Sequence, residues 1–332
     1  MAITYNSESK VFIRNNWDKP LLKLIEKKTG NKLLYVGLPS PEAEDIDAWI
    51  EHLRVVIAFQ CRKYGELSDP KQDRKDILKL HEKLLSYERE MKLENFIVYD
   101  GYIEEVVLRG YDNSPDASID FELNEIVTVY NLDFCNNITS PIEFLDRNGN
   151  LKKAYKFNAI KELIQNQNNL ATGSDKFVLF LTVQSSYKGG ELEHFINPYK
   201  QTNKEINDLI AKYNKLDTET KNQKIVQLFV IDTLKSFFRT NNIIPHFLPT
   251  IFYNGLNDLG LLHFTVLGTA NEANVGEAPW NQCIADLCSE KRITVLKEKF
   301  TLLTCEGIEF NDVQTQPVKA FSQSKTFSKL WI

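Results

Sequence analysis

The sequence predicts an α/β protein built on a doubly wound, mostly parallel sheet of seven strands. Short apolar runs alternate with stretches of helical periodicity along most of the chain, the pattern of repeated strand-helix units. The run at 177–183 is almost wholly apolar, as expected for a parallel strand covered on both faces. The last two runs are joined by the turn-rich link NGLNDLG, which is too short for a parallel crossover. They are therefore expected to pair antiparallel.

The first strand-helix-strand unit occupies residues 32–59. Strand 32–37 (KLLYVG) is followed by a helix for which Ser40 is a suitable N-cap and Pro41 a suitable first residue. Residues 102–108 fit either a strand or a short helix. The seven expected strands are 32–37, 55–59, 96–99, 126–132, 177–183, 249–253 and 261–267, and the further expected helices are 71–91, 157–170, 204–212 and 225–238.

The chain is expected to divide into three parts. A lead-in segment covers 1–30, the α/β domain covers 31–269, and an appended segment covers 270–332, with a helical pattern at 280–287 and a hairpin at 293–310.

Composition excludes several classes of protein. The net charge is −5 and there is no long Lys/Arg run, so nucleic acid is possible as a substrate but unsupported by charge. The five scattered cysteines form no disulfide framework, and no apolar signal or membrane-spanning run is present, so a cytoplasmic protein is expected. No two histidines stand at metal-ligand spacing, so no metal is expected. The Asn, Lys and Ile content is typical of a bacterial source with an AT-rich genome.

Five parallel units closed by a reversed final strand resemble the class I S-adenosylmethionine-dependent methyltransferase fold, a Rossmann-like sheet. The resemblance covers residues 31–268 and depends on element order. It implies S-adenosylmethionine as the cofactor, bound at the carboxyl ends of the parallel strands.

The cofactor-binding residues that the resemblance implies are Gly37, Leu38, Pro39, Gln60, Asp100 and Gly101. The loop after the first strand is usually glycine-rich, but here one glycine is followed by two prolines. The acid that usually ends the second strand and binds the ribose is replaced by Gln60. A carboxylate at Asp100 is placed to contact the adenine amino group. Each position has a plainer interpretation: a capped helix start after Gly37, and a turn at Asp100-Gly101.

The catalytic residues that the resemblance implies follow the fourth strand. Asp133 would hold or deprotonate the acceptor, Phe134 would pack on it, and Asn136 would lie nearby. The alternative for Asp133 is a strand-end carboxylate that caps local backbone.

Two functions follow from these patterns. The first is an S-adenosylmethionine-dependent methyltransferase of unknown substrate. The second is a catalytically inactive methyltransferase-like protein that acts as a binding or scaffold subunit. The place of Asp133 after the fourth strand favours the first function. The altered cofactor loop favours the second, for which the C-terminal segment, with Phe327, Leu330 and Trp331, offers apolar anchors for a protein partner.

Overall fold

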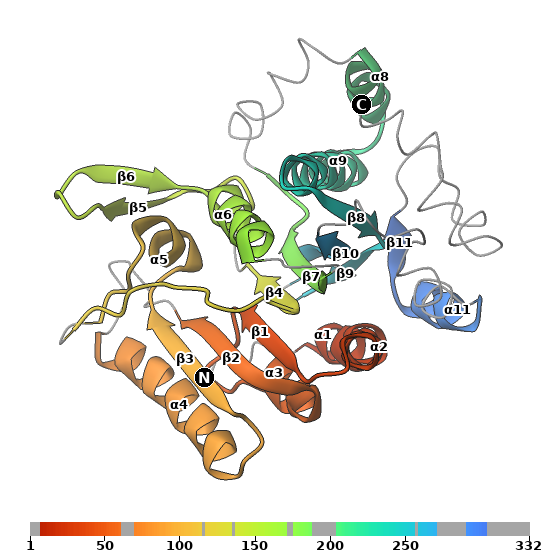
Figure 1. Cartoon of the computed structure of the whole chain (residues 1–332). Coiled ribbons are helices and arrows are strands. Elements are labelled where there is room, and N and C mark those ends of the chain that lie inside the picture. Colours follow the sequence, from red (N-terminus) through yellow and green to blue (C-terminus); the bar gives the residue numbers. More distant parts are fainter. Residues whose placement is uncertain are drawn as a thin grey trace. The chain divides into compact units, whose positions relative to one another are not determined.

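The chain comprises two compact units. The computed structural model describes residues 7–60, 70–114, 117–134, 137–170, 175–187, 204–255, 258–270 and 290–303. One unit is Met1–Asp133 with Pro141–Phe180, and the other is Phe134–Ser140 with Leu181–Ile332. Strand β7 (Asp175–Gln184) begins in the first unit and ends in the second (Figure 1).

The first unit is built on parallel strands in the order β7-β4-β1-β2-β3. Strand β1 pairs in parallel with both β2 and β4, and β2 pairs in parallel with β3. This is a doubly wound order, in which the chain leaves β1 for one side of the sheet and later crosses to the other side at β4. The strands other than β7 are β1 (Leu33–Gly37), β2 (Leu53–Gln60), β3 (Asn95–Asp100) and β4 (Val129–Asp133).

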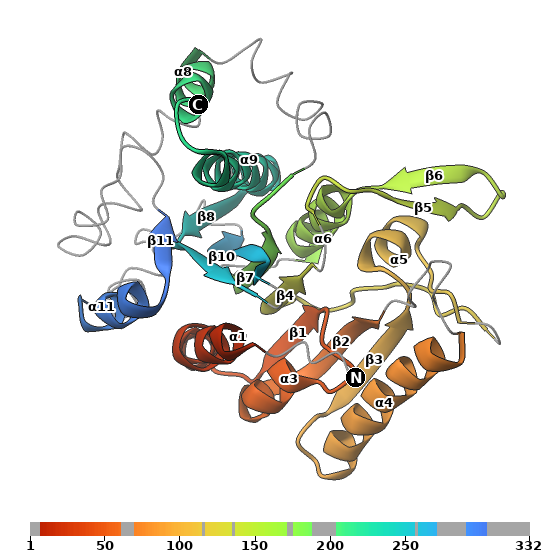
Figure 2. The ribbon, with the colours of Figure 1, turned by 180° about the vertical axis from the view of Figure 1, so that it is seen from behind.

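Helices cover both faces of these strands. Helices α2, α3 and α4 lie on one face and α5 and α6 on the other, as Figures 1 and 2 show. Because both faces are covered, every residue of β1 is buried, which explains its continuous apolar sequence. The helices of this unit are α1 (Glu8–Ile13), η1 (Arg14–Asp18), α2 (Lys19–Thr29), α3 (Glu44–Trp49), η2 (Ile50–His52), α4 (Pro70–Arg89), α5 (Ile103–Arg109) and α6 (Lys156–Leu170).

The start expected for the helix after β1 is wrong. Helix α3 begins at Glu44, four residues after the expected cap, and no side chain caps it. The amide of Ala43 donates to the carbonyl of Ser40 at 2.8 Å, which closes a turn where the helix was expected to begin. Ala43 itself lies in the left-handed region, with φ 54°.

The stretch that fitted either a strand or a helix is helical. Helix α5 follows Gly101, whose φ of +147° leads the chain out of β3 and into the helix.

The second unit carries the reversed strand that the sequence predicts. Strand β10 pairs antiparallel with β8 and with β9, and β11 pairs antiparallel with β9. Thr182 at the end of β7 lies 3.0 Å from the ring of His263, and the amide of Ser185 donates to the carbonyl of Gly260 at 2.9 Å. Positions therefore rise on β7 as they fall on β10, so these strands are antiparallel. The elements are α8 (Lys204–Tyr213), α9 (Thr218–Thr240), β8 (Ile243–Phe247), β9 (Thr250–Asn254), β10 (Gly260–Ala270), α11 (Glu290–Lys299) and β11 (Thr301–Leu303).

Three strands, β5, β6 and β8, lie where the sequence predicts none, and β11 lies within the hairpin predicted at 293–310. With β8 and β11, the sheet has nine strands among the described residues instead of seven. Strands β5 (Ile142–Leu145) and β6 (Leu151–Ala154) form a separate antiparallel hairpin around an Asn-Gly-containing turn. No helix among the described residues is long and apolar enough to cross a membrane. The helix predicted at 280–287 lies outside the described residues. The hairpin predicted at 293–310 is wrong over 293–299, which belong to helix α11, whereas Thr301–Leu303 within it is the strand β11.

His246 on β8 gives the second unit a pH-dependent stability. The side chain is buried, and neither ring nitrogen has a hydrogen-bond partner among the described residues. Burial lowers the pKa of His246 to about 4.

We predict that the free energy of unfolding falls as the pH is lowered from about 6.5 to about 4. In that window the unfolded chain binds a proton at His246 that the folded chain does not, and the loss totals roughly 3 kcal/mol. The check is chemical denaturation across this range. His246→Leu should flatten the dependence, whereas His81→Gln, at an exposed histidine, should leave it unchanged. Equal slopes for the protein and His246→Leu would show that His246 titrates normally.

Candidate functional site at the carboxyl ends of β1 and β4

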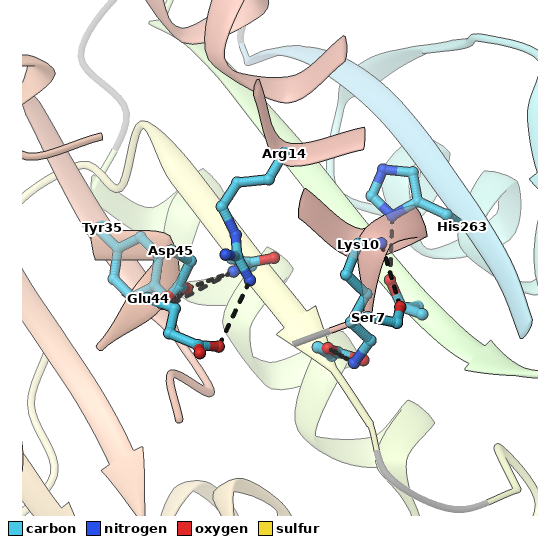
Figure 3. A network of polar contacts seen from close by, with 10 residues as sticks. Ser7, Lys10, Arg14, Tyr35, Glu44, Asp45 and His263 are labelled. Atoms are coloured by element: carbon cyan, nitrogen blue, oxygen red, sulfur yellow. Dashed lines mark hydrogen bonds and ion pairs between the residues drawn. The ribbon is translucent and has the colours of Figure 1, made fainter. Parts of the chain in front are cut away.

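The strand order marks one edge of the sheet as the place for a ligand. In doubly wound sheets, ligands bind outside the carboxyl ends of the strands, where the strand order reverses. In the first unit this point lies between β1, which ends at Gly37, and β4, which ends at Asp133. Polar side chains gather there from α1, η1, α3 and the two strands (Figure 3).

A buried hydrogen-bond network joins β1, α3 and β4. The hydroxyl of Tyr35 donates to Oδ2 of Asp45 at 2.6 Å, and the side-chain amide of Asn131 donates to the same oxygen at 2.6 Å. Burial, with the nearby Asp45 charge, raises the pKa of Tyr35 well above its ordinary value. The phenol therefore stays protonated and acts as a donor to the carboxylate.

Two buried polar atoms of this region have no hydrogen-bond partner among the described residues. They are Oδ1 of Asp45 and the hydroxyl of Ser40, both in the segment that follows β1. The Asp45 side chain belongs to a residue only 6% exposed, so bulk water does not readily serve this oxygen. Because an unpaired buried acceptor costs free energy, a donor is expected at Oδ1.

Only a glycine fits at position 37, because other atoms of the protein occupy the space that a Cβ would fill. A Cβ at this position would lie 2.6 Å from the carbonyl oxygen of Asn131 and would also overlap the hydroxyl of Tyr35. The glycine thus admits the Tyr35 side chain, whereas the resemblance assigns it the close approach of a cofactor. Of the next two residues, Leu38 is half-buried and donates its amide to the carbonyl of Asn131 at 3.0 Å, and Pro39 is buried.

The lead-in segment supplies two cations that sequence reasoning missed. Lys10 on α1 forms an ion pair and a hydrogen bond with Asp133 at the end of β4. Arg14 lies 4.0 Å from Glu44 at the start of α3, and its carbonyl accepts a hydrogen bond from the indole of Trp49 at 3.3 Å. Burial raises the pKa of the Glu44 carboxyl, although Arg14 opposes the shift. Asp133 is therefore one member of a charged cluster.

Gln60 and Asp100 lie together, on the next two strands. They are register partners at the ends of β2 and β3. The carbonyl of Gln60 accepts from the amide of Gly101 at 3.1 Å, and the carbonyl of Asp100 accepts from Asn113 at 2.7 Å. The amide of Asp100 donates to the buried carboxylate of Asp112 at 3.2 Å. The backbone of Asp100-Gly101 thus forms the turn into α5, and the role of the Asp100 side chain toward adenine stays a prediction.

Phe134 and Asn136 are the other two residues predicted to contact the methyl acceptor. Phe134 is buried in the second unit and donates its amide to Thr182 at 3.0 Å. Asn136 lies outside the described residues. No group of three or more His, Cys, Asp or Glu side chains suited to a metal ion occurs in the described part of the chain.

Comparisons with known proteins concern the fold alone. No family model and no curated protein matches the chain. Similar solved structures include an O-methyltransferase from Bacillus cereus in complex with SAH, with 9% identity over 81% of this chain and 84% of that one, at a TM-score of 0.35. They also include the 1,6-didemethyltoxoflavin-N1-methyltransferase of Burkholderia thailandensis, with 10% identity over 81% and 84% of the two chains and a TM-score of 0.32.

A third is CalS10, an amino pentose methyltransferase from Micromonospora echinaspora, with 7% identity over 82% of this chain and all of that one, at a TM-score of 0.31. Superpositions this loose carry no functional argument. The class I methyltransferase-like fold follows from the parallel strand order and the reversed strand β10.

The Lys10–Asp133 pair should contribute measurably to stability, because its side chains are only 21% and 30% exposed. We predict a coupling of roughly 0.5–1 kcal/mol in a double-mutant cycle of Lys10→Met and Asp133→Asn, weakening as salt is raised to about 1 M. The measurement is urea unfolding. The exposed pair Lys79–Glu42 is the control and should show no measurable coupling. A coupling energy of zero between Lys10 and Asp133 at low salt would mean that this ion pair does not stabilise the contact of α1 with the end of β4.

Proposed function

We propose that this chain is an S-adenosylmethionine-dependent methyltransferase whose acceptor is held at Asp133. The observation that carries the proposal is the position of this carboxylate. Asp133 ends β4 at the point where the strand order reverses, and it already binds an amine, the side chain of Lys10. A donor group of an acceptor molecule would make the same kind of hydrogen bond there.

The first loop does not offer the cofactor its glycine. Tyr35 occupies the space beside Gly37, so close approach of a ligand at that point is not supported. The hydroxyl of Ser40 and Oδ1 of Asp45 are enclosed by protein atoms, so the cofactor would have to be held by groups nearer the surface. The half-buried amide of Gln60 would accept from a ribose hydroxyl. When bound, the cofactor supplies an electrophilic methyl group.

The chain's own contribution to the reaction would be mainly positioning. Asp133 would accept a hydrogen bond from the nucleophilic N–H or O–H group of the acceptor and take its proton as the methyl group is transferred. Holding the nucleophile in line with the methyl group removes most of the entropic cost of the reaction. Lys10 would have to break its hydrogen bond to Asp133, or share the carboxylate with the acceptor. Phe134 and Asn136 remain the residues expected to complete the acceptor site.

A specific observation favours the second function, an inactive methyltransferase-like binding or scaffold subunit. The open side of Gly37 is filled by Tyr35 and Asn131, and Asp133 is paired with Lys10. Both contacts are those of a site closed by the protein's own atoms. The C-terminal segment as a surface for a protein partner belongs to this alternative.

We predict saturable binding of S-adenosylmethionine and S-adenosylhomocysteine with a Kd in the micromolar range, about −8 kcal/mol. Calorimetric titration of the full chain measures it. Gln60→Glu should tighten binding by roughly three- to tenfold, because a carboxylate makes stronger hydrogen bonds to the ribose hydroxyls than an amide does.

The matched control is Asn95→Asp, which adds the same charge at the opposite end of the neighbouring strand β3. This variant should leave the Kd for both ligands unchanged. Absence of heat with either ligand, from protein shown to be folded by its thermal transition, would refute cofactor binding and favour the scaffold function.

A further inference from the structure

The lead-in helix is held by different contacts in its two halves. Its second half, α2, packs through Leu21, Leu22 and Ile25, which are fully buried. Its first half, α1, buries Ile13 alone among its six residues, and its other side chains are exposed or half-buried. Apolar burial therefore fixes α2 firmly, whereas α1 depends more on its polar contacts.

The π-helical turn η1 separates these two halves. The amide of Lys19 donates to the carbonyl of Arg14, five residues back instead of the four of an α-helix. The indole of Trp49 donates to the same carbonyl at 3.3 Å, so this carbonyl serves a side chain as well as the helix. Single π-turns are frequent at functional sites and are one cause of helix kinks. The start of η1 is therefore the point at which α1 can bend away while α2 stays packed.

Lys10 and Arg14 attach α1 to the carboxyl ends of the strands. They are four positions apart and so lie on the same side of the helix, and Figure 3 shows both extending toward carboxylates. Lys10 bonds to Asp133, and Arg14 lies 4.0 Å from Glu44. All four side chains are between 15% and 30% exposed, so water and small solutes reach both pairs. Partly exposed ion pairs contribute little free energy each, which permits exchange with ions from solution.

We propose that the Lys10–Asp133 pair is an autoinhibitory contact, in which Lys10 stands in for an acceptor that carries an amine. Helix α1 holds its own ammonium on the carboxylate that the acceptor needs, and the ammonium of the acceptor displaces it as α1 bends away at η1. The inference rests on the proposed function for the role of Asp133, and it adds the substrate class and the element that controls access. An incoming ammonium restores the charge pair that is broken, whereas a neutral acceptor does not.

The test measures hydrogen exchange of the backbone amides in α1 and α2 of the full chain. The probe is n-butylammonium, which matches the end of a lysine side chain. Tetramethylammonium at the same ionic strength has the charge but no N–H donor. The matched control variant is Lys19→Met, which removes an ion pair to Glu51 at 2.9 Å, at the first residue of α2.

We expect n-butylammonium to speed exchange in α1 at least about threefold, in the protein and in Lys19→Met, and to leave α2 unchanged. Tetramethylammonium should have no such effect. Lys10→Met should exchange rapidly in α1 without any amine, because the contact that holds α1 on Asp133 is gone.

Binding of the amine is measured separately, from the rise of the thermal midpoint with n-butylammonium concentration. Lys10→Met should bind n-butylammonium about two- to fivefold more tightly than the protein, since Lys10 no longer competes for Asp133. Asp133→Asn should not be stabilised. Should Lys10→Met fold poorly, Lys10→Arg provides the second test. Its guanidinium bonds a carboxylate through two hydrogens, so more n-butylammonium should be needed to speed exchange in α1.

The autoinhibitory contact is refuted if α1 exchanges equally in Lys10→Met and in the protein, or if n-butylammonium acts no differently from tetramethylammonium. Faster exchange of α1 and α2 together would also refute it, because the lead-in helix would then detach as one piece. The proposed function fails separately. Displacement of α1 by the amine, without calorimetric binding of S-adenosylmethionine, would keep Asp133 as an amine site controlled by Lys10 and refute the methyltransferase.

Discussion

The hydrogen bond from Tyr35 to buried Asp45 is the constraint on which the carboxyl edge of the first unit depends. It places a phenol beside Gly37, where only a residue without a Cβ fits. It draws the start of α3 toward β1, and the chain reaches that position through a turn closed by Ser40 and a left-handed residue at Ala43. The late start of α3 and the closed space over the first loop are consistent with this one buried contact, because burial of the pair leaves little freedom to rearrange.

Because of this contact, the groups left for binding at this edge belong to side chains and not to the backbone. A glycine-rich first loop presents amides to a ligand, whereas this loop contains prolines and uses the amide of Leu38 on Asn131. The oxygens of Ser40 and Asp45 that lack partners are enclosed, so what remains for binding are the partly exposed charged groups brought by α1 and η1. The lead-in helices are therefore part of the edge, and the chemistry there is that of carboxylates and amines.

The strands of the first unit could be predicted because buried parallel strands are continuous apolar runs, and the reversed strand because a short link permits only antiparallel pairing. Strand β8 was missed because Pro245 and His246 interrupt its apolar pattern. Strand β11 lies within the predicted hairpin, but helix α11 stands where the first strand of that hairpin was expected, since Ile293, Thr294 and Val295 are β-branched residues that favour strands. The side-chain contacts at the carboxyl ends of the strands were harder to predict. Lys10 and Asp133 are 123 positions apart, and sequence gives the sign of a charge but not its partner. In the acidic run before Trp49, only tertiary packing distinguishes buried Asp45 from exposed Asp47.

The energetics of Asp45 also bear on the choice between enzyme and scaffold. A carboxylate removed from water is destabilising unless it is fully hydrogen-bonded, and replacing such a group with an apolar side chain of similar volume is often neutral or stabilising. Because Oδ1 of Asp45 is enclosed by the protein's own atoms, this acid acts through Tyr35 and Asn131, which it ties to the start of α3. A buried acid kept for this tie fits a scaffold as well as an enzyme. The choice between the two functions therefore falls to Asp133, whose side chain is 30% exposed and lies within reach of an acceptor.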